Sequence, residues 1–452
     1  MPAPGVNEDA AVAPPPAVSF AQALRFWLRL GFVSFGGPAG QIALMHTELV
    51  ERRRWISERR FLHALNYCML LPGPEAQQLA TYIGWLMHRS LGGIVAGVLF
   101  VLPSLFILIA LSWVYVRFGE QPLVAGIFYG IKPAVTALVL HAAYRIGTRA
   151  LKSRWLWALA AASFAAIFFF QVPFPAIVLA AGLAGALGGR LAPHVFVPGG
   201  GHAGADKGYG PALLDDDTPT PAHARYSRAG LLRVLGAGLA LWGVAMGLLV
   251  ATQGADGLLT QMGWFFTKAA LLTFGGAYAV LPYVYQGAVE QQQWLSAAQM
   301  IDGLALGETT PGPLIMVVAF VGFVGAWFKP MFGPDALFLA GAAAAAVVTF
   351  FTFLPSFVFI LAGGPLVEAT HGRLGYTAPL TAITAAVVGV IVNLALFFAW
   401  HVLWPKGWGG PFDAVSAAIA LAAAVALWRF KLGVLPLLGA CAVAGLVTQL
   451  LR

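Results

Sequence analysis

The sequence predicts an all-α polytopic membrane protein whose two homologous halves form an inverted-topology repeat with broken or re-entrant helices. Three observations predict this class. The chain has 452 residues, 60% of them hydrophobic and only 10% charged, and apolar runs of about 20 residues recur along it. The helix breaks of the first half return in the second at a constant spacing. The arginines between the first breaks are absent from the matching positions of the second half.

The remaining composition excludes several classes. The net charge of +8 does not indicate a nucleic-acid partner, because the basic residues cluster in a few loops, as cytoplasmic loops do. Cys68 and Cys441 lie in apolar surroundings, which argues against a disulfide framework or a metal cluster. We find no catalytic motif and expect no cofactor. Residues 1–19 lack the basic region of a signal peptide and are expected to form a disordered tail.

The repeat begins in the first half and is offset by 239 residues. Ser34-Phe35-Gly36-Gly37 matches Thr273-Phe274-Gly275-Gly276, and Pro72-Gly73-Pro74 matches Pro311-Gly312-Pro313. Over the 41 positions from Ser34 to Pro74, 11 residues are identical, against about three expected by chance. These matches predict a first repeat at 20–190, a polar linker at 191–228, a connecting transmembrane helix at 229–253 and a second repeat at 254–452.

The charge bias of the repeat predicts its orientation. The stretch ERRRWISERR at 51–60 carries five arginines, whereas the matching EQQQWLSAAQ at 290–299 has none. Opposite charge bias in equal structures indicates that the two copies face opposite sides of the membrane. If the segments around each Gly-Gly and Pro-Gly-Pro are re-entrant, most basic loops, including 145–154, fall on one side.

The helix breaks predict a substrate site. Broken membrane helices at matching positions in two inverted halves point to a transporter's binding site, and a half-helix that starts after a break presents free N–H groups to an anion. The alternative is that the glycines only allow close packing and the prolines only kink the helices. The candidate binding residues are Ser34, Gly36, Gly37, Pro72, Gly73, Thr273, Gly275, Gly276, Pro311 and Gly312.

Two lysines lie within apolar runs and complete the candidate binding set. Lys132 and Lys268 are candidate anion ligands or counter-ions, because a cation in a membrane needs a partner. The alternative is that their ammonium groups reach to the membrane interface. Arg25 and Arg29, four residues apart on one helix face, are expected at the interface rather than in the site.

Three acids at membrane depth are candidates for proton coupling. Glu75 follows the first Pro-Gly-Pro, Glu308 precedes the second, and Asp302 takes the position of His63. Burial disfavours the charged form of a carboxyl group, so such a group can take up and release a proton near neutral pH. The alternative is that the carboxylate caps a half-helix.

Four stretches resemble the chromate ion transporter family in its two-domain form: FVSFGGPAGQIALMHTELVERRRWIS, LLPGPEAQQLATYIGWLMHRSLGG, TFGGAYAVLPYV and GETTPGPL. The resemblance implies secondary export of chromate across the bacterial inner membrane, as a proton-driven transporter or an oxyanion antiporter, and hence chromate resistance. The implied partners are chromate, protons and the lipid bilayer, and a homodimer stays open. Pro38 and Glu75 are replaced by Ala277 and Leu314, so the halves are not expected to contribute equivalent ligands.

Two alternatives stay open. Sulfate has nearly the shape and charge of chromate, and a site of N–H groups and cations can bind both. A multipass membrane enzyme or an assembly subunit is the other alternative. An enzyme should carry a cluster of polar residues in a loop that faces the membrane, and the sequence contains none.

Overall fold

The computed structural model describes residues 15–191, 209–274, 276–329, 331–370 and 377–451. Within these ranges the chain is helical and forms no sheet, which confirms the predicted all-α class. Six helices are long and apolar enough to cross a membrane: α4 (Glu75–Phe118), α5 (Pro122–Ala150), α7 (Phe174–Leu191), α9 (Arg228–Gln253), α14 (Leu337–Thr370) and α15 (Thr377–Leu403).

The first half contains short broken helices followed by long ones. A kink divides α4 at His88 and Arg89, where Arg89 has a φ of 58°. Ser57 accepts a hydrogen bond from the N–H of Arg60 and so caps the helix that follows. In addition to α4, α5 and α7, the elements are α1 (Phe20–Val33), α2 (Gly37–His46), the π-helical turn η1 (Thr47–Arg52), α3 (Glu58–Leu70) and α6 (Arg154–Phe170).

The second half follows the same order after η2 (Ala222–Ala224) and α9. Ser296 caps its helix as Ser57 does, and a π-helical turn again precedes the cap. The remaining elements are α10 (Leu258–Leu272), α11 (Ala277–Val284), η3 (Tyr285–Gln291), α12 (Ala297–Thr309), η4 (Leu314–Met316), α13 (Val317–Trp327), η5 (Pro334–Ala336), α16 (Ala414–Trp428) and α17 (Val434–Leu450).

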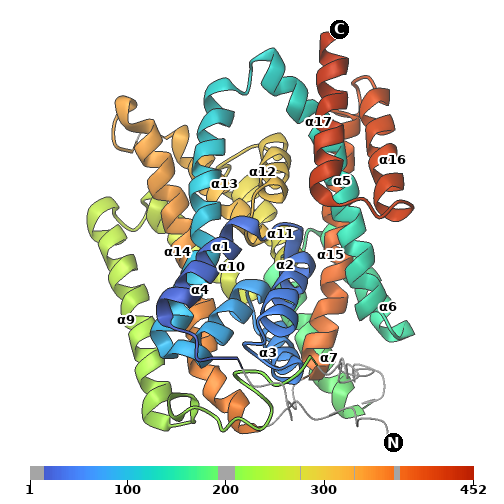
Figure 1. Ribbon diagram of the computed structural model, residues 1–452. Helices are drawn as coiled ribbons and strands as arrows, with labels where there is room; N and C mark the ends of the chain where they lie inside the picture. The colour runs from blue at the N-terminus through green and yellow to red at the C-terminus, as the bar shows by residue number, and fades with distance from the viewer. Residues whose placement is uncertain (1–14, 192–208, 275, 330, 371–376, 452) are drawn as a thin grey trace, which may run out of the picture.

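The matched long helices run in opposite directions. In Figure 1, α4 rises to the top and α5 descends, whereas α14 descends and α15 rises. The halves also exchange contacts, because α5 packs against α16 and α17, and α15 packs against α6 and α7. An inverted repeat requires this antiparallel, reciprocal arrangement. Which side of the membrane each loop faces stays a prediction.

The segment from α3 to the kink of α4 is a hairpin that enters and leaves at one end of the molecule. Ser57 donates its hydroxyl proton to Asp216 (2.6 Å), and His223 donates to the carbonyl of Trp85 (2.9 Å). Both ends of the hairpin are thus tied to the segment 209–226. This is the re-entrant geometry that the sequence predicts for the first Pro-Gly-Pro.

The other short segments also return on themselves. Phe26 of α1 packs against Trp55, which follows η1, with ring centroids 4.9 Å apart. Phe265 of α10 packs in the same way against Trp294 after η3, at 5.4 Å. A Cβ on Gly325 near the end of α13 would lie 3.0 Å from the Cβ of Trp294, so α12 and α13 form the fourth hairpin.

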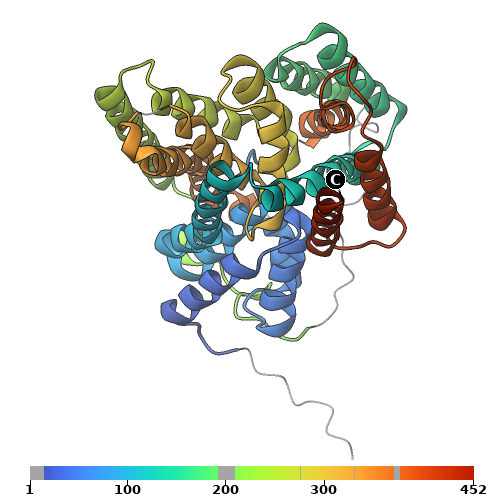
Figure 2. The ribbon, with the colours of Figure 1, turned by 90° about the horizontal axis from the view of Figure 1, so that it is seen from above.

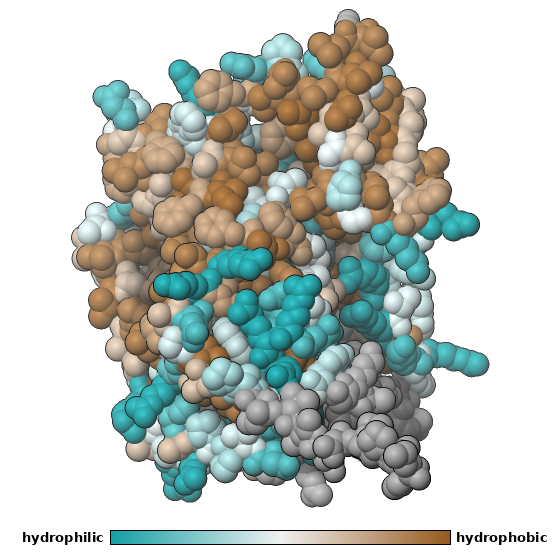
Figure 3. Space-filling view, viewed as in Figure 1, coloured by the Kyte–Doolittle hydropathy of each residue, from teal (hydrophilic) through white to brown (hydrophobic). Residues whose placement is uncertain are grey.

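The surface of the molecule is divided by polarity. Figure 3 shows mainly apolar residues over the upper part of this face and hydrophilic residues over the lower part. Seen from above in Figure 2, α9 lies at the periphery, and none of its residues is buried. The apolar exterior is typical of a protein that lies in a bilayer.

Candidate functional site

The tips of the four hairpins meet at the centre of the molecule (Figure 1). The N–H of Gly73 donates to the carbonyl of Thr273 (2.8 Å), and the N–H of Gly312 donates to the carbonyl of Ser34 (2.8 Å). Each donor and each acceptor is 239 residues from its counterpart. The two breaks of one half are thus bonded to the two breaks of the other half by a reciprocal pair of hydrogen bonds.

Several polar groups that the sequence analysis assigned to anion binding form hydrogen bonds within the protein instead. The N–H groups of Gly73 and Gly312 already have protein acceptors. The hydroxyl groups of Ser34 and Thr273 donate to carbonyls of their own helices, Leu30 (2.6 Å) and Ala269 (2.7 Å). Pro72 lies at its tip and accepts a hydrogen bond from Gln78 (2.8 Å). These residues form the frame of the site.

The Pro-Gly-Pro glycines are closely packed against neighbouring helices. A Cβ on Gly73 would lie 2.4 Å from Oγ of Ser356, and one on Gly312 would lie 2.9 Å from Cβ of Ser104. Both glycines also have positive φ values, 127° and 102°, which residues other than glycine rarely adopt. Gly73, Gly312 and the buried Pro311 therefore let two backbones approach each other.

The Gly-Gly breaks are more open. A Cβ on Gly37 would meet no atom within 4 Å, and one on Gly36 would meet only the Cα of Gly40, at 3.8 Å. Gly276 faces the carboxyl group of Glu75, whose Oε1 lies 3.7 Å from the position of a Cβ. Gly275 lies outside the described residues. The described glycines of these breaks line space at the tips.

The helices that start at the tips have no side-chain cap. At α2, α4 and α11 no side chain of the N-cap residue bonds to the first turn. By contrast, serine caps begin α1, α3 and α12 at the opposite ends of the hairpins. The uncapped first turns leave N–H groups and a positive dipole end at the centre, which suits an anion.

Three buried glutamines were missed by the sequence reasoning. Gln41 donates to the carbonyl of Gly312 (2.5 Å), Gln78 to that of Pro72 (2.8 Å), and Gln77 to the hydroxyl of Thr81 (3.1 Å). Their side-chain oxygens are buried and have no partner among the described residues. The Gln-Gln pair two residues after Glu75, within an apolar helix, is the signal that could have found Gln77 and Gln78.

Two of the candidate acids are close to the tips. Glu75 is the first residue of α4, but the N-cap is Pro74, so the structure gives no support to a capping role for this carboxylate. Glu308, at the end of α12, is buried and accepts a hydrogen bond from the hydroxyl of Tyr278. Tyr278 belongs to the first turn of α11.

Asp302 and Lys132 form an ion pair apart from these two acids. Nζ of Lys132 lies 3.2 Å from Oδ2 of Asp302, which also accepts a hydrogen bond from Tyr115 (2.8 Å). Asp302 is 3% exposed, so its charge needs such a partner. The ion pair fits the counter-ion role of Lys132, and the choice between its two expected roles stays a prediction.

The other candidate cations lie on the surface of the molecule. Lys268 is exposed, and its ammonium lies 5.9 Å from the centroid of Trp264, as the interfacial alternative requires. Arg25 and Arg29 are exposed on α1. In the described part of the chain, none of these three side chains forms an ion pair.

The expected basic loop at 145–154 is wrong for its first part, because Arg145 and Arg149 belong to the last turns of α5. Both side chains are exposed and form no ion pair with Glu75 or Glu308 in the described residues, so their charges act on these acids only at a distance. The four-residue spacing places both guanidinium groups on one helix face, and this spacing could have been recognised in the sequence.

The centre thus combines uncapped helix N-termini, buried amides and two acids, and two exposed arginines of α5 act on it at a distance. Such groups can hold an anion and exchange a proton. Within the described residues, no group of histidine, cysteine, aspartate and glutamate side chains could hold a metal ion.

The chain was compared with known proteins. The family model described as "Chromate transporter" matches residues 21–186 and 260–446. A chromate transport protein of Pseudomonas aeruginosa is 33% identical over 96% of this chain and 93% of its own length. One of Cupriavidus metallidurans is 30% identical over 92% and 90%. A probable chromate transport protein of Synechococcus elongatus is 26% identical over 92% and 91%.

No solved structure matches the chain. The bacterial relatives and the six apolar helices of membrane length fit a multi-pass protein of the bacterial inner membrane. The family model covers both halves and leaves out the tail, the linker and all of α9. The chain therefore belongs to the chromate transporter family.

Proposed function

We propose that this protein is a secondary transporter that exports chromate across the inner membrane and confers chromate resistance. The supporting observation is the reciprocal pair of hydrogen bonds, Gly73 to Thr273 and Gly312 to Ser34, which holds the four breaks together at the centre. A site that both inverted halves share can open alternately to either side when one half moves against the other.

Chromate binds between the uncapped first turns of α2, α4 and α11, beside Gly36, Gly37 and Gly276. Backbone N–H groups supply hydrogen bonds to its tetrahedral oxygens, and Arg145 and Arg149 supply positive charge. Sulfate presents the same charge and nearly the same shape, so the proposal includes it as a competitor or exchange partner.

Export has two candidate energy sources, the proton gradient and exchange for another oxyanion. Glu75 is the first choice for the proton-responsive group, Glu308 the second and Asp302 the third. Proton-driven export moves protons inward as chromate moves outward, so on this proposal Glu75 takes up a proton when the site is open to the outside and releases it when the site is open to the cytoplasm. Asp302 ranks last because Lys132 already neutralises it.

The test is uptake of radiolabelled chromate into inverted membrane vesicles, with and without an imposed pH gradient and with sulfate competing. Glu75→Gln keeps the size of the side chain but holds it neutral. We expect this variant to bind chromate and to lose the dependence of flux on the pH gradient. Glu120→Gln removes the same charge from an exposed position between α4 and α5 and is the matched control.

Three outcomes decide among the alternatives. Absence of chromate uptake by the wild-type protein would contradict the proposed function. Full gradient dependence in Glu75→Gln moves the proton-responsive role to Glu308. Uptake that needs sulfate on the opposite side, at any pH gradient, identifies oxyanion exchange as the energy source.

A further inference from the structure

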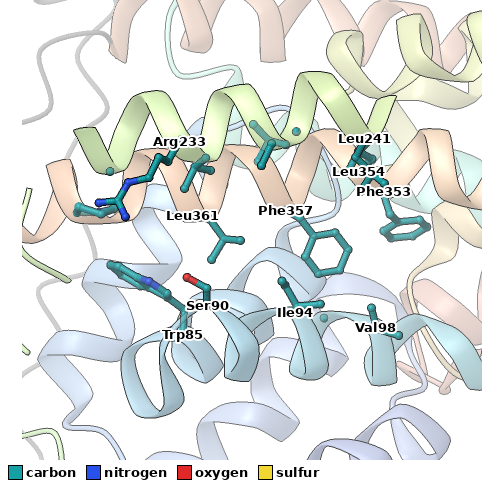
Figure 4. Close-up of a pocket in the computed structure, with 18 of the residues that line it drawn as sticks. Trp85, Ser90, Ile94, Val98, Arg233, Leu241, Phe353, Leu354, Phe357 and Leu361 are labelled. Carbon is teal, nitrogen blue, oxygen red and sulfur yellow. The ribbon is translucent and has the colours of Figure 1, made fainter. Parts of the chain in front are cut away.

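A pocket separate from the central site lies between α4, α9 and α14, with a volume of about 890 Å³ (Figure 4). Helix α9 forms its outer wall, although none of the residues of this helix is buried. The helix contacts α14 closely at Gly238, where a Cβ would lie 2.4 Å from Val358. The pocket therefore opens between a peripheral helix and the body of the protein, where lipid is the surrounding solvent.

Most of the pocket wall is apolar. Figure 4 shows Ile94 and Val98 of α4 facing Phe357 of α14, with Leu241 of α9 and Phe353 towards one end. A long apolar channel between membrane helices suits an acyl chain, because burial of hydrocarbon against these side chains is favourable and no polar group is left unpaired.

The opposite end of the pocket is cationic and polar. Arg233 of α9 lies there beside Trp85 and Ser90 (Figure 4), and Arg225 also lines the pocket. Nε of Arg233 donates to the carbonyl of Ala229 (3.2 Å). In the described part of the chain, no acid lies within ion-pair distance of either arginine. Two exposed arginines thus line this end of the pocket without an acidic partner.

The charged end lies on the side of the basic stretch. Ile56, within ERRRWISERR, pairs with Leu214 of the linker, and the same linker leads through His223, bonded to Trp85, to Arg225 and α9. The sequence predicts this side to be cytoplasmic. The cytoplasmic leaflet carries anionic lipids, and basic pockets between membrane helices bind their headgroups.

We propose that this pocket is a binding site for one anionic phospholipid. Arg225 and Arg233 bind the headgroup phosphate, and an acyl chain lies along Ile94, Val98 and Phe357. The combination of charge at one end and hydrocarbon along the remaining length distinguishes this occupant from a free phosphate, which the apolar walls would repel, and from a neutral lipid, which would leave the arginines unpaired.

A lipid in this pocket would pack against the wall that separates the pocket from the central site. A Cβ on Gly97 of the pocket wall would lie 2.5 Å from Phe357 and 2.7 Å from Nε2 of Gln77. The wall of the lipid pocket is therefore in direct contact with the buried amide that follows Glu75. Binding should raise the thermal stability of the protein, because the lipid binds the folded protein only.

The test titrates purified full-length protein in detergent with phosphatidylglycerol, phosphatidylcholine of the same acyl chains, or inorganic phosphate. Lipid binding is counted by native mass spectrometry, and thermal stability is followed in parallel. We expect one phosphatidylglycerol to bind tightly and to raise the melting temperature. Arg225→Gln with Arg233→Gln should weaken its binding by about 30-fold, whereas Arg228→Gln, an exposed neighbour that does not line the pocket, should not.

A second variant tests the acyl part of the site. Ile94→Trp fills the apolar end and should reduce phosphatidylglycerol binding while the arginines remain. Equal binding of phosphatidylcholine would overturn the proposal, as would stabilisation by inorganic phosphate alone or unchanged binding in the double arginine variant. These outcomes are independent of chromate flux, so the lipid site can fail while the proposed transport function stands.

Discussion

The two halves share one backbone frame, but their tips carry different side chains. After the first Pro-Gly-Pro the chain continues Glu75-Ala76-Gln77-Gln78, and after the second it continues Leu314-Ile315-Met316-Val317. The latter four residues are at most 2% exposed and wholly apolar. At this break, only the first half offers polar side chains to the centre.

The second half places its polar groups before the break instead. Glu308, Tyr278 and Asp302 take the positions of Met69, Ala39 and His63 in the first half. The frame must be alike in both halves, because each half bonds to the other through the same carbonyl and N–H groups. Binding of an anion does not require that the two halves carry the same side chains. The site is therefore symmetric in its backbone and asymmetric in its charges.

The largest effect is expected in a labelling test of the inverted orientation of the two halves. If the halves are not inverted, they cannot be compared position by position as opposite-facing copies. Arg52 and Gln291 are matched and exposed. Arg52→Cys and Gln291→Cys should react with a membrane-impermeant thiol reagent from opposite sides, in an all-or-none manner, because the repeat is inverted. Cys68 and Cys441 are buried and supply the low background. Labelling of both sites from one side would contradict the inversion.

The shared frame should tolerate no side chain at its glycines. Gly36→Val and Gly275→Val are expected to abolish transport, and the structure adds Gly73→Val, which would strike Ser356. A side chain at the positive φ values of Gly36 and Gly73 costs about 1–3 kcal/mol. Chromate flux normalised to inserted protein measures the effect.

The matched control is Gly333→Val in the loop before η5. Gly333 has a φ of 94°, but its Cβ would meet no atom within 4 Å. This variant carries the same backbone strain far from the tips and should keep most of the flux. If Gly73→Val is inserted, folded and as active as Gly333→Val, the frame does not form the site.

The asymmetry of the tips can be tested by giving the first half the residues of the second. Gln77→Met with Gln78→Val should lower chromate flux about tenfold or more, since each lost hydrogen bond to an anion is worth about 1.5–3 kcal/mol. Stability should change little, because each substitution removes one donated hydrogen bond together with one buried, unpaired side-chain oxygen.

The control for this exchange is Met316→Leu with Val317→Ile, which repacks the apolar tip conservatively. We expect near-normal flux from it. Comparable losses in both double variants, with unchanged melting temperatures, would show that the two tips contribute equally to transport and would remove the asymmetry.

The smallest effect on transport is expected from the ion pair of Asp302 and Lys132. This pair is possible in the second half only, because the matching residue of the first half is His63. Lys132→Met should lower stability by about 3 kcal/mol or less, because it leaves a buried carboxylate without its cation. Lys132→Met with Asp302→Asn should recover most of that loss, as measured by thermal unfolding. Recovery of flux along with stability indicates a structural pair. A stable but inactive double variant would instead make Lys132 an anion ligand.

Local patterns in the sequence were sufficient for much of the fold. The apolar runs predict the helices, the Gly-Gly and Pro-Gly-Pro positions predict the breaks, and Ser57 and Ser296 predict two N-caps that the structure confirms. Each of these depends on residues within one or two turns of each other, so one segment contains all the information required.

The sequence reasoning failed where a residue's role depends on a distant neighbour. Lys268 and Lys132 look alike within their apolar runs, yet one is exposed and the other meets Asp302, 170 residues away in the chain. Arg145 and Arg149 were assigned to a loop because basic residues suggest a helix end, whereas α5 continues through them.

What the sequence by itself determined is therefore the repeat, the breaks and the helical class, since these follow from composition and short-range spacing. The tertiary structure alone decided which break meets which. The bonds from Gly73 to Thr273 and from Gly312 to Ser34 join positions at least 200 residues apart in the chain. They depend on the packing of two interlocked halves, and a backbone N–H or carbonyl group carries no residue-specific signal of its partner.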